Sequence, residues 1–292
     1  MDQRDFLAEQ FEDHRTHLKA VAYRMLGSMS EADDAVQEAW IRLNRSDADE
    51  IENLGGWLTT VVARISLNML RSRKTRREEP MDLRMPEPIV DPVDGPDPEH
   101  EAILADSVGL ALLVVLETLS PPERLAFVLH DMFGVRFEEI GRILDRSEQA
   151  ARQLANRARK KVHAAPTEPD PDLDAQREVV DAFLAASREG DFEALVAVLD
   201  PDVVSRGDLG RGRPMREAHG AEAVASNALA FRGLGLEVRP ALVNGTVGAV
   251  SLRDGKPFSI GAITVKNGKI VEMDFFADPA RLAQIDLTIL DD

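Results

Sequence analysis

The sequence predicts a multidomain protein with two all-helical modules, followed by a module of helices packed on a curved antiparallel sheet. Three observations support this fold class. Apolar residues recur at helical spacing through the first 165 residues, whereas the last third holds three Asn-Gly or Asp-Gly pairs between alternating runs, a pattern typical of β-hairpins. Two proline-rich stretches separate the parts. A chain of 292 residues is also long enough for several small cores.

The proline-rich stretches set the expected boundaries. Residues 80–102 are acidic and rich in proline, which removes backbone donors and interrupts helices, so we expect an extended linker there. Residues 166–172 form a second, shorter break of the same character. The modules are therefore expected at residues 1–79, 103–165 and 173–292.

The first module is predicted to contain amphipathic helices. Ser30 is expected to cap one of them, and a longer helix starts near Leu54 and ends in a basic run at residues 71–77. The apolar face of the capped helix contains Ala32, Ala35, Val36, Ala39, Trp40 and Leu43.

The second module has the spacing of a helix-turn-helix. Ser120 and Glu123 form a capping-box pattern before a helix that runs to Met132. A short helix at residues 137–144, a tight turn at Asp145 and a helix capped by Ser147 follow.

The last helix of this module carries a face suited to DNA. Its core side is expected to hold Ala151, Leu154, Ala158 and Val162. The outer side then presents Gln149, Arg152, Gln153 and Asn156, and arginine suits guanine whereas glutamine and asparagine suit adenine. Further along lie the phosphate candidates Arg157, Arg159, Lys160 and Lys161. The alternative is a solvated basic helix on an ordinary bundle.

Charge and composition exclude other classes. The net charge of −17 opposes DNA binding as a sum, but basic residues concentrate at 71–77 and 152–161. The chain has no cysteine, so it forms neither a disulfide nor a thiolate zinc site, and we expect no metal and no cofactor. No run of about twenty apolar residues occurs, so we expect a cytoplasmic protein without a membrane partner.

Several segments resemble the extracytoplasmic-function (ECF) RNA polymerase sigma factors. Residues 22–28, 32–40 and 57–71 resemble sigma region 2, whereas residues 119–124, 137–141 and 147–159 resemble region 4. The resemblance implies that the chain binds core RNA polymerase, through its beta-prime and beta subunits, and promoter DNA, with no catalytic residue of its own.

The resemblance also assigns roles to individual residues. Docking on the beta-prime coiled coil is implied for Asp33, Asp34, Gln37, Glu38 and Trp40. Contact with the minus-10 element is implied for Arg64, Asn68, Arg71, Arg73 and Lys74. Contact with the minus-35 element is implied for Gln149, Arg152, Gln153, Asn156, Arg157, Arg159 and Lys160. Trp57 is interpreted as a core residue.

The third module resembles the SnoaL-like, NTF2-like cone fold, which sigma factors of a sigma-J-like subgroup carry. Residues 85–88 resemble the Trp-Leu-Pro-Glu-Pro motif of that subgroup, residues 278–282 its Asn-Pro-Asp-Lys-Leu motif, and residues 208–213 match its Asp-Gly-Gly-Gly-Lys loop in part. The resemblance implies that the cone modulates activity in cis. Regulatory contacts are expected for Pro86, Glu87, Pro88, Asp208, Gly210, Arg211, Gly212, Asp278, Pro279 and Arg281.

Three alternatives stay open at this point. The cone fold also hosts cyclases and isomerases, so the chain could be a DNA-binding module fused to an enzyme, with Asp208, His219 and Asp274 as acid–base candidates. It could bind a small apolar ligand in its cone. It could also be a plain helix-turn-helix repressor that never meets polymerase.

Overall fold

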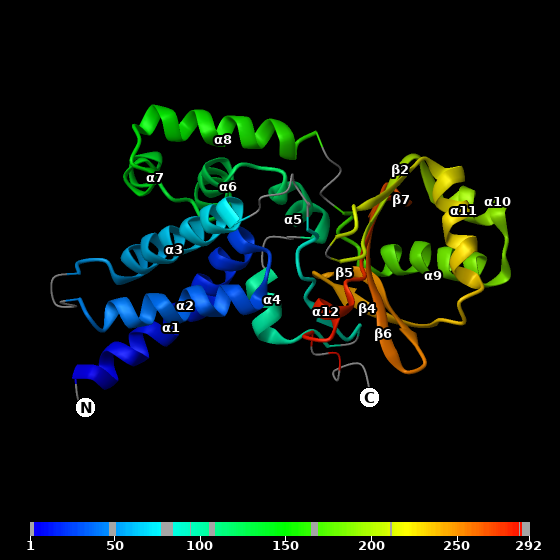
Figure 1. Cartoon of the computed structure of the whole chain (residues 1–292), viewed down its shortest axis with the longest axis horizontal. Coiled ribbons are helices and arrows are strands. Elements are labelled where there is room, and N and C mark those ends of the chain that lie inside the picture. Colours follow the sequence, from blue (N-terminus) through cyan, green and yellow to red (C-terminus); the bar gives the residue numbers. More distant parts are fainter. Residues whose placement is uncertain are drawn as a thin grey trace. The chain divides into compact units, whose positions relative to one another are not determined.

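The computed structural model describes residues 3–46, 51–76, 84–93, 95–104, 109–164, 169–210, 212–285 and 287. These residues fold into two compact units (Figure 1). The helical unit comprises Met1–Met81 and Val115–Ala164, and the sheet unit comprises Asp82–Val114 and Ala165–Asp292. The expected fold class is confirmed, because all-helical parts accompany a curved sheet with helices on one face. None of the described helices is long and apolar enough to cross a membrane.

Three helices form the N-terminal part of the helical unit: α1 (Gln3–Leu26), α2 (Met29–Leu43) and α3 (Leu54–Arg76). The predicted apolar face of α2 is buried, apart from Trp40, which is only partly buried. The predicted cap at Ser30 is wrong. Ser28 caps α2 instead, because Gly27 turns the chain at a φ of 67° and α2 begins directly after Ser28, whose hydroxyl accepts from the N–H of Glu31 at 3.4 Å.

The helix-turn-helix predicted from the sequence is present in the same unit. It consists of α6 (Pro121–Phe127), a π-helical turn (Val128–Met132), α7 (Phe137–Leu144) and α8 (Glu148–Val162). The capping box is confirmed, since the Glu123 carboxylate accepts from both the N–H and the hydroxyl of Ser120. The turn closes tightly at Gly141, where a Cβ atom would lie 2.8 Å from the carbonyl oxygen of Arg146.

Six strands build the main sheet: β2 (Leu199–Asp208), β3 (Arg216–His219), β4 (Glu237–Val243), β5 (Thr246–Arg253), β6 (Lys256–Lys266) and β7 (Lys269–Phe276). The three predicted hairpin turns join β4 to β7 in succession, and their Asn, Asp and Gly residues have positive φ angles. The expectation of a purely antiparallel sheet is wrong, because β2 and β7 run parallel. No hairpin joins these two strands, so local turn signals could not reveal their direction.

Helices α9 (Leu173–Glu189), α10 (Phe192–Val198) and α11 (Ala221–Arg232) cover one face of this sheet (Figure 1). Their apolar sides and the strands share a core that includes Val180, Phe183, Leu195, Val203 and Met273. A short helix, α12 (Pro279–Leu282), follows the last strand.

The segment between the helical modules is not the extended linker that proline content predicts. It contains a seventh strand, β1 (Val90–Asp91), and two helices, α4 (Pro98–Leu104) and α5 (Leu110–Glu117). Strand β1 pairs antiparallel with β4, and the Asn244 side chain accepts from the N–H of Ile89 at 3.1 Å while the Asn244 N–H donates to the Ile89 carbonyl at 2.8 Å. Pro98 is tolerated because it occupies the first position of α4. Residues 82–114 therefore group with the sheet unit, across the boundary expected at residue 103.

A buried ion pair joins β1 to α4 and makes this junction sensitive to pH. His100 Nδ1 lies 2.8 Å from the carboxylate of Asp91, which is buried. The hydrogen bond to Asp91 raises the pKa of His100 against the effect of partial burial, and the carboxylates of Asp97 and Glu99 raise it further. Because the pKa is raised, the pair stabilises the junction fully below about pH 6.5, and this stabilisation is lost as the pH rises through the folded-state pKa.

We expect an NMR titration of the full chain to give His100 a pKa above that of an exposed histidine. In an Asp91→Asn variant the same resonance should titrate at lower pH, because the charged partner is gone. A wild-type value at or below 6.5 would contradict the account of the junction.

Candidate functional sites

Helix α8 presents the side chains expected to read bases. Gln149, Arg152, Gln153 and Asn156 are exposed, and the predicted core side of the helix is buried. Ser147 caps the helix by accepting from the N–H of Ala150 at 3.2 Å. The predicted division of α8 into a core face and an outer face is therefore confirmed.

The cations of α8 that were expected to meet phosphate are held by carboxylates. Arg157 and Lys161 lie 3.3 Å and 3.6 Å from Glu123, and Arg159 pairs with Asp131. Partial burial would raise the pKa of Glu123, but hydrogen bonds from Ser120 and the charges of Lys161 and Arg157 lower it on balance. A phosphate would have to replace these carboxylates.

Arg152 has two neighbours in the same region. Its guanidinium pairs with Glu148 at 2.8 Å and lies over the ring of Phe137, 5.2 Å from the ring centre. Lys160 is exposed.

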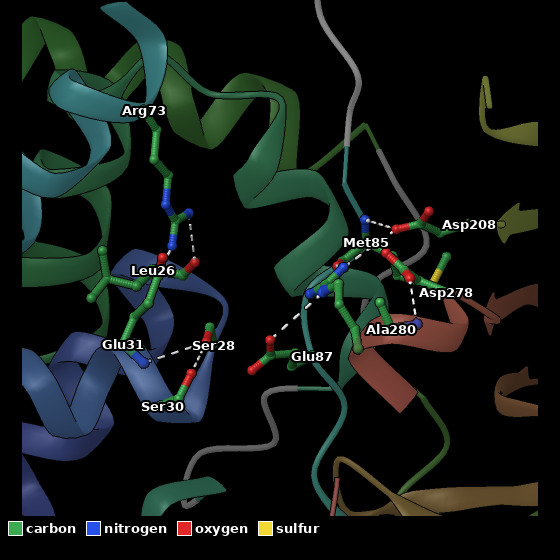
Figure 2. Close-up of polar contacts among 11 residues, drawn as sticks. Leu26, Ser28, Ser30, Glu31, Arg73, Met85, Glu87, Asp208, Asp278 and Ala280 are labelled. Carbon is green, nitrogen blue, oxygen red and sulfur yellow. Dashed lines mark hydrogen bonds and ion pairs between the residues drawn. The ribbon is translucent and has the colours of Figure 1, made fainter. Parts of the chain in front are cut away.

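Helix α3 carries a second polar face. Arg64, Asn68 and Arg71 are exposed at positions four and seven apart, so they share one side of the helix. Arg73 does not join them: it donates to the carbonyl of Leu26 at 3.1 Å and pairs with Glu31 (Figure 2). The side chain of Lys74 lies outside the described residues.

Helix α2 presents the acidic residues expected to dock on polymerase. Asp33, Asp34 and Gln37 are exposed and Glu38 is partly buried. Two of the carboxylates have cationic neighbours, since Asp33 lies 3.0 Å from Lys19 and Glu38 lies 2.9 Å from Arg42. The Trp40 ring packs on Phe11 with ring centres 4.9 Å apart. Trp57, interpreted as a core residue, is only partly buried.

Within the sheet unit, residues 85–88, 208–213 and 278–282 meet in a cluster that we call the linker clamp (Figure 2). The N–H of Met85 donates to the Asp208 carboxylate at 3.0 Å, and the Met85 carbonyl accepts from Arg281 at 2.9 Å. Arg281 also lies 3.4 Å from Asp208 and 3.6 Å from Glu87. Met85, Pro86 and Pro88 are buried.

The loop after β2 is shaped by the same clamp. The second oxygen of the Asp208 carboxylate accepts from the N–H of Gly210 at 2.9 Å. A Cβ atom on Gly210, which has a φ of 94°, would lie 2.9 Å from the carboxyl carbon of Asp278. Asp278 caps α12 through the N–H of Ala280 at 3.0 Å, with Pro279 in the first turn. Gly212 has a positive φ, whereas Arg211 lies outside the described residues.

The three acid–base candidates do not converge. Side chains alternate along a strand, and Val203 and Met273 point into the core beneath the helices, so Asp208 and Asp274 point to the opposite face of the sheet. Asp274 lies 3.1 Å from Arg206, and burial raises the pKa of Asp274 to about 6 although Arg206 lowers it. His219 is exposed beside Glu217 on an edge strand.

Sequence reasoning missed three interactions at these sites. They are the buried pairing of Arg206 with Glu272 and Asp274, the clasp between Asn244 and Ile89, and the buried Arg124. A charged residue facing two acids across parallel strands leaves no local signal. Among the described residues, no group of three or more His, Cys, Asp or Glu side chains could hold a metal ion.

Comparison with known proteins agrees with these sites. The Sigma-70 region 2 family matches residues 10–76, and the Sigma-70 region 4 family matches residues 109–162. The ECF RNA polymerase sigma factor SigJ of Mycobacterium tuberculosis is 41% identical over 290 residues, covering 92% of this chain and 91% of the relative. The probable ECF sigma factor SigI of the same organism is 39% identical, covering 73% of each chain.

A solved structure extends the match to the whole fold. The crystal structure of M. tuberculosis SigJ superimposes with a TM-score of 0.76 and 37% identity, covering 96% of this chain and 99% of the other. Full-length similarity at this identity includes the helix-turn-helix, the basic face of α3 and the sheet unit. The chain therefore belongs to the ECF family of RNA polymerase sigma factors.

Proposed function

We propose that this chain binds core RNA polymerase and directs it to promoters by recognising a minus-35 and a minus-10 element. The single observation that carries the proposal is the exposed polar face of α8, capped by Ser147 and supported by a buried core side within a helix-turn-helix. Membership of the ECF sigma family gives that face its target.

On α8 we assign base reading and phosphate contact to different residues. Gln149, Arg152, Gln153 and Asn156 lie toward the N-terminal half of the helix, where a recognition helix enters the major groove. Arg157, Arg159 and Lys160 follow and would supply affinity without sequence information.

The minus-10 face is assigned to α3, with Arg64, Asn68 and Arg71 as its exposed members. Arg73 we reassign to a positioning role, because its contacts with Leu26 and Glu31 hold the end of α3 against α1 and α2. The beta-prime subunit would dock on α2 at Asp33, Asp34, Gln37 and Glu38, with Trp40 as an apolar neighbour.

We assign the sheet unit a regulatory role in cis. Its clamp binds the segment that joins the two helical modules, through Asp208 and Arg281 on Met85 and through Arg281 on Glu87. Pro86, Pro88, Gly210, Asp278 and Pro279 shape the same contact. A segment held in this way cannot extend freely between the two modules.

An enzymatic cone is not favoured, because Asp208, His219 and Asp274 all lie away from the core that the helices cover. Binding of a small apolar ligand in the cone stays a secondary proposal, to be tested by thermal shift with apolar probes. Work with polymerase on promoters would place the chain in the cytoplasm.

Run-off transcription with purified core polymerase tests the proposed function. We compare the full chain with one truncated after Val162 and one truncated before Asp278. Initiation from a defined promoter by any of them supports the sigma assignment, and differences among them locate control in the sheet unit. Failure of all three to bind core polymerase would favour the repressor or the fused enzyme.

Removing the carboxylate that holds Arg159 should strengthen promoter binding. In an Asp131→Asn variant we expect the holoenzyme to bind promoter DNA about threefold more tightly at 50 mM salt, with a steeper salt dependence, because one more cation becomes available to phosphate. Fluorescence anisotropy at several salt concentrations measures this. Asp181→Asn, an exposed change of equal charge on α9, is the control. Equal tightening by both variants would show that net charge alone is responsible.

Opening the linker clamp should change both local protection and transcription. In an Arg281→Ala variant we expect faster hydrogen exchange at residues 85–91 and about a threefold rise in run-off product, because the joining segment gains reach. Arg253→Ala, an exposed arginine on β5, is the control. Faster exchange with unchanged transcription would contradict the regulatory role.

A further inference from the structure

The parts of the chain that read the two promoter elements pack together in the helical unit. Helix α3 contacts α6 and α7, and α1 contacts the π-helical turn after α6. We call this contact between the region 2 helices and the region 4 helices the seam. Its polar centre is Arg124, which is buried and donates to the carbonyl of Met25 at 2.9 Å while pairing with Glu117 at 2.7 Å.

The seam uses an end of a helix that needs partners. The last carbonyls of a helix have no acceptor role inside it and carry partial negative charge. At the end of α1, Arg73 of region 2 occupies the Leu26 carbonyl and Arg124 of region 4 occupies the Met25 carbonyl. Two neighbouring carbonyls thus bind one arginine from each region.

An aromatic contact forms the second part of the seam. Phe133, just after the π-helical turn, meets the ring of His17 edge-on at 5.2 Å and lies under the guanidinium of Arg24 at 4.9 Å. Partial burial lowers the pKa of His17, and the charges of His14 and Arg24 lower it further, so the neutral ring packs against Phe133.

A third contact lies on the face proposed for the minus-10 element. Arg64 donates to the backbone carbonyl of Arg142 in α7 at 3.4 Å. Region 4 therefore engages one of the residues of α3 that would otherwise approach DNA.

The seam conflicts with the distance between the two promoter elements. Elements centred near minus 35 and minus 10 are about 25 base pairs apart, or roughly 85 Å at about 3.4 Å per base pair. A compact unit of the size of Met1–Met81 with Val115–Ala164 is only roughly 35–40 Å across. One unit of this size cannot place α3 and α8 on both elements at once.

We propose that the seam is a closed resting state of the factor, held by Arg124 and Phe133, which must open before both promoter elements are bound. This inference rests on the proposed sigma function. It adds a contact within the helical unit itself, separate from the linker clamp of the sheet unit.

The absence of cysteine allows a direct distance measurement on the full chain. Spin labels at Asp13→Cys on α1 and His163→Cys after α8 occupy exposed positions outside the seam and the proposed binding faces. We expect one short distance in the free factor and a longer one in the complex with core polymerase and promoter DNA. A short distance that persists in a transcribing complex overturns the inference.

Variants of the aromatic contact test what holds the seam. Phe133→Ala should raise the ratio of open to closed factor about tenfold, seen as a larger long-distance fraction without polymerase. His17→Ala removes the opposite half of the contact at an exposed position and should shift the ratio in the same direction. Phe231→Ala, which truncates an exposed phenylalanine of the sheet unit, is the matched control and should leave the distances unchanged.

The outcomes separate this inference from the proposed function. If neither seam variant changes the distances while wild-type protein initiates transcription, the seam is not the latch and only this inference fails. If wild-type protein binds core polymerase but never initiates, the proposed function fails, and the closed-state inference fails with it.

Discussion

The carboxylate of Asp208 is the interaction on which the sheet unit's hold on the joining segment depends. It is buried, and a buried charge is costly unless donors surround it. One oxygen accepts from the N–H of Met85 and lies near Arg281, while the other accepts from the N–H of Gly210. The joining segment therefore supplies one of the donors that make burial of this charge tolerable. Withdrawal of Met85 would leave the β2 loop and Arg281 to satisfy the carboxylate alone.

The same segment is also built into the sheet. An open sheet edge presents unpaired N–H and C=O groups, and strand β1 covers such an edge on β4. Ile89 and Val90 are buried there, and Asn244 bonds the Ile89 backbone through both its side chain and its own N–H. Polar contacts at Met85 and edge pairing at residues 89–91 thus fix two successive points of one tether. Regulation by this unit acts on the connection between the DNA-binding parts.

Local chemistry predicted the helix-turn-helix, its capping box, the two faces of α8 and the three hairpins, because each depends on residues a few positions apart. The misses depend on distant partners. Proline content could not reveal that residues 90–91 find β4, nor could a turn signal orient β2 against β7. Ser28 and Ser30 are equally good caps in isolation, and the turn at Gly27 decides between them. Arg73 belonged to a basic run but found a helix end and Glu31 instead.

Arginines that a sequence assigns to DNA are in several places already occupied by protein. Arg157 and Lys161 share Glu123, Arg159 pairs with Asp131, and Arg64 reaches a backbone carbonyl. Exposed ion pairs contribute only about 0–1 kcal/mol each, so phosphate can displace them, but each exchange yields less than a free cation would. With a net charge of −17 opposing approach to DNA, such exchanges give the factor alone little affinity for random sequence. Discrimination then rests on base contacts by α8, made once polymerase holds the factor in place.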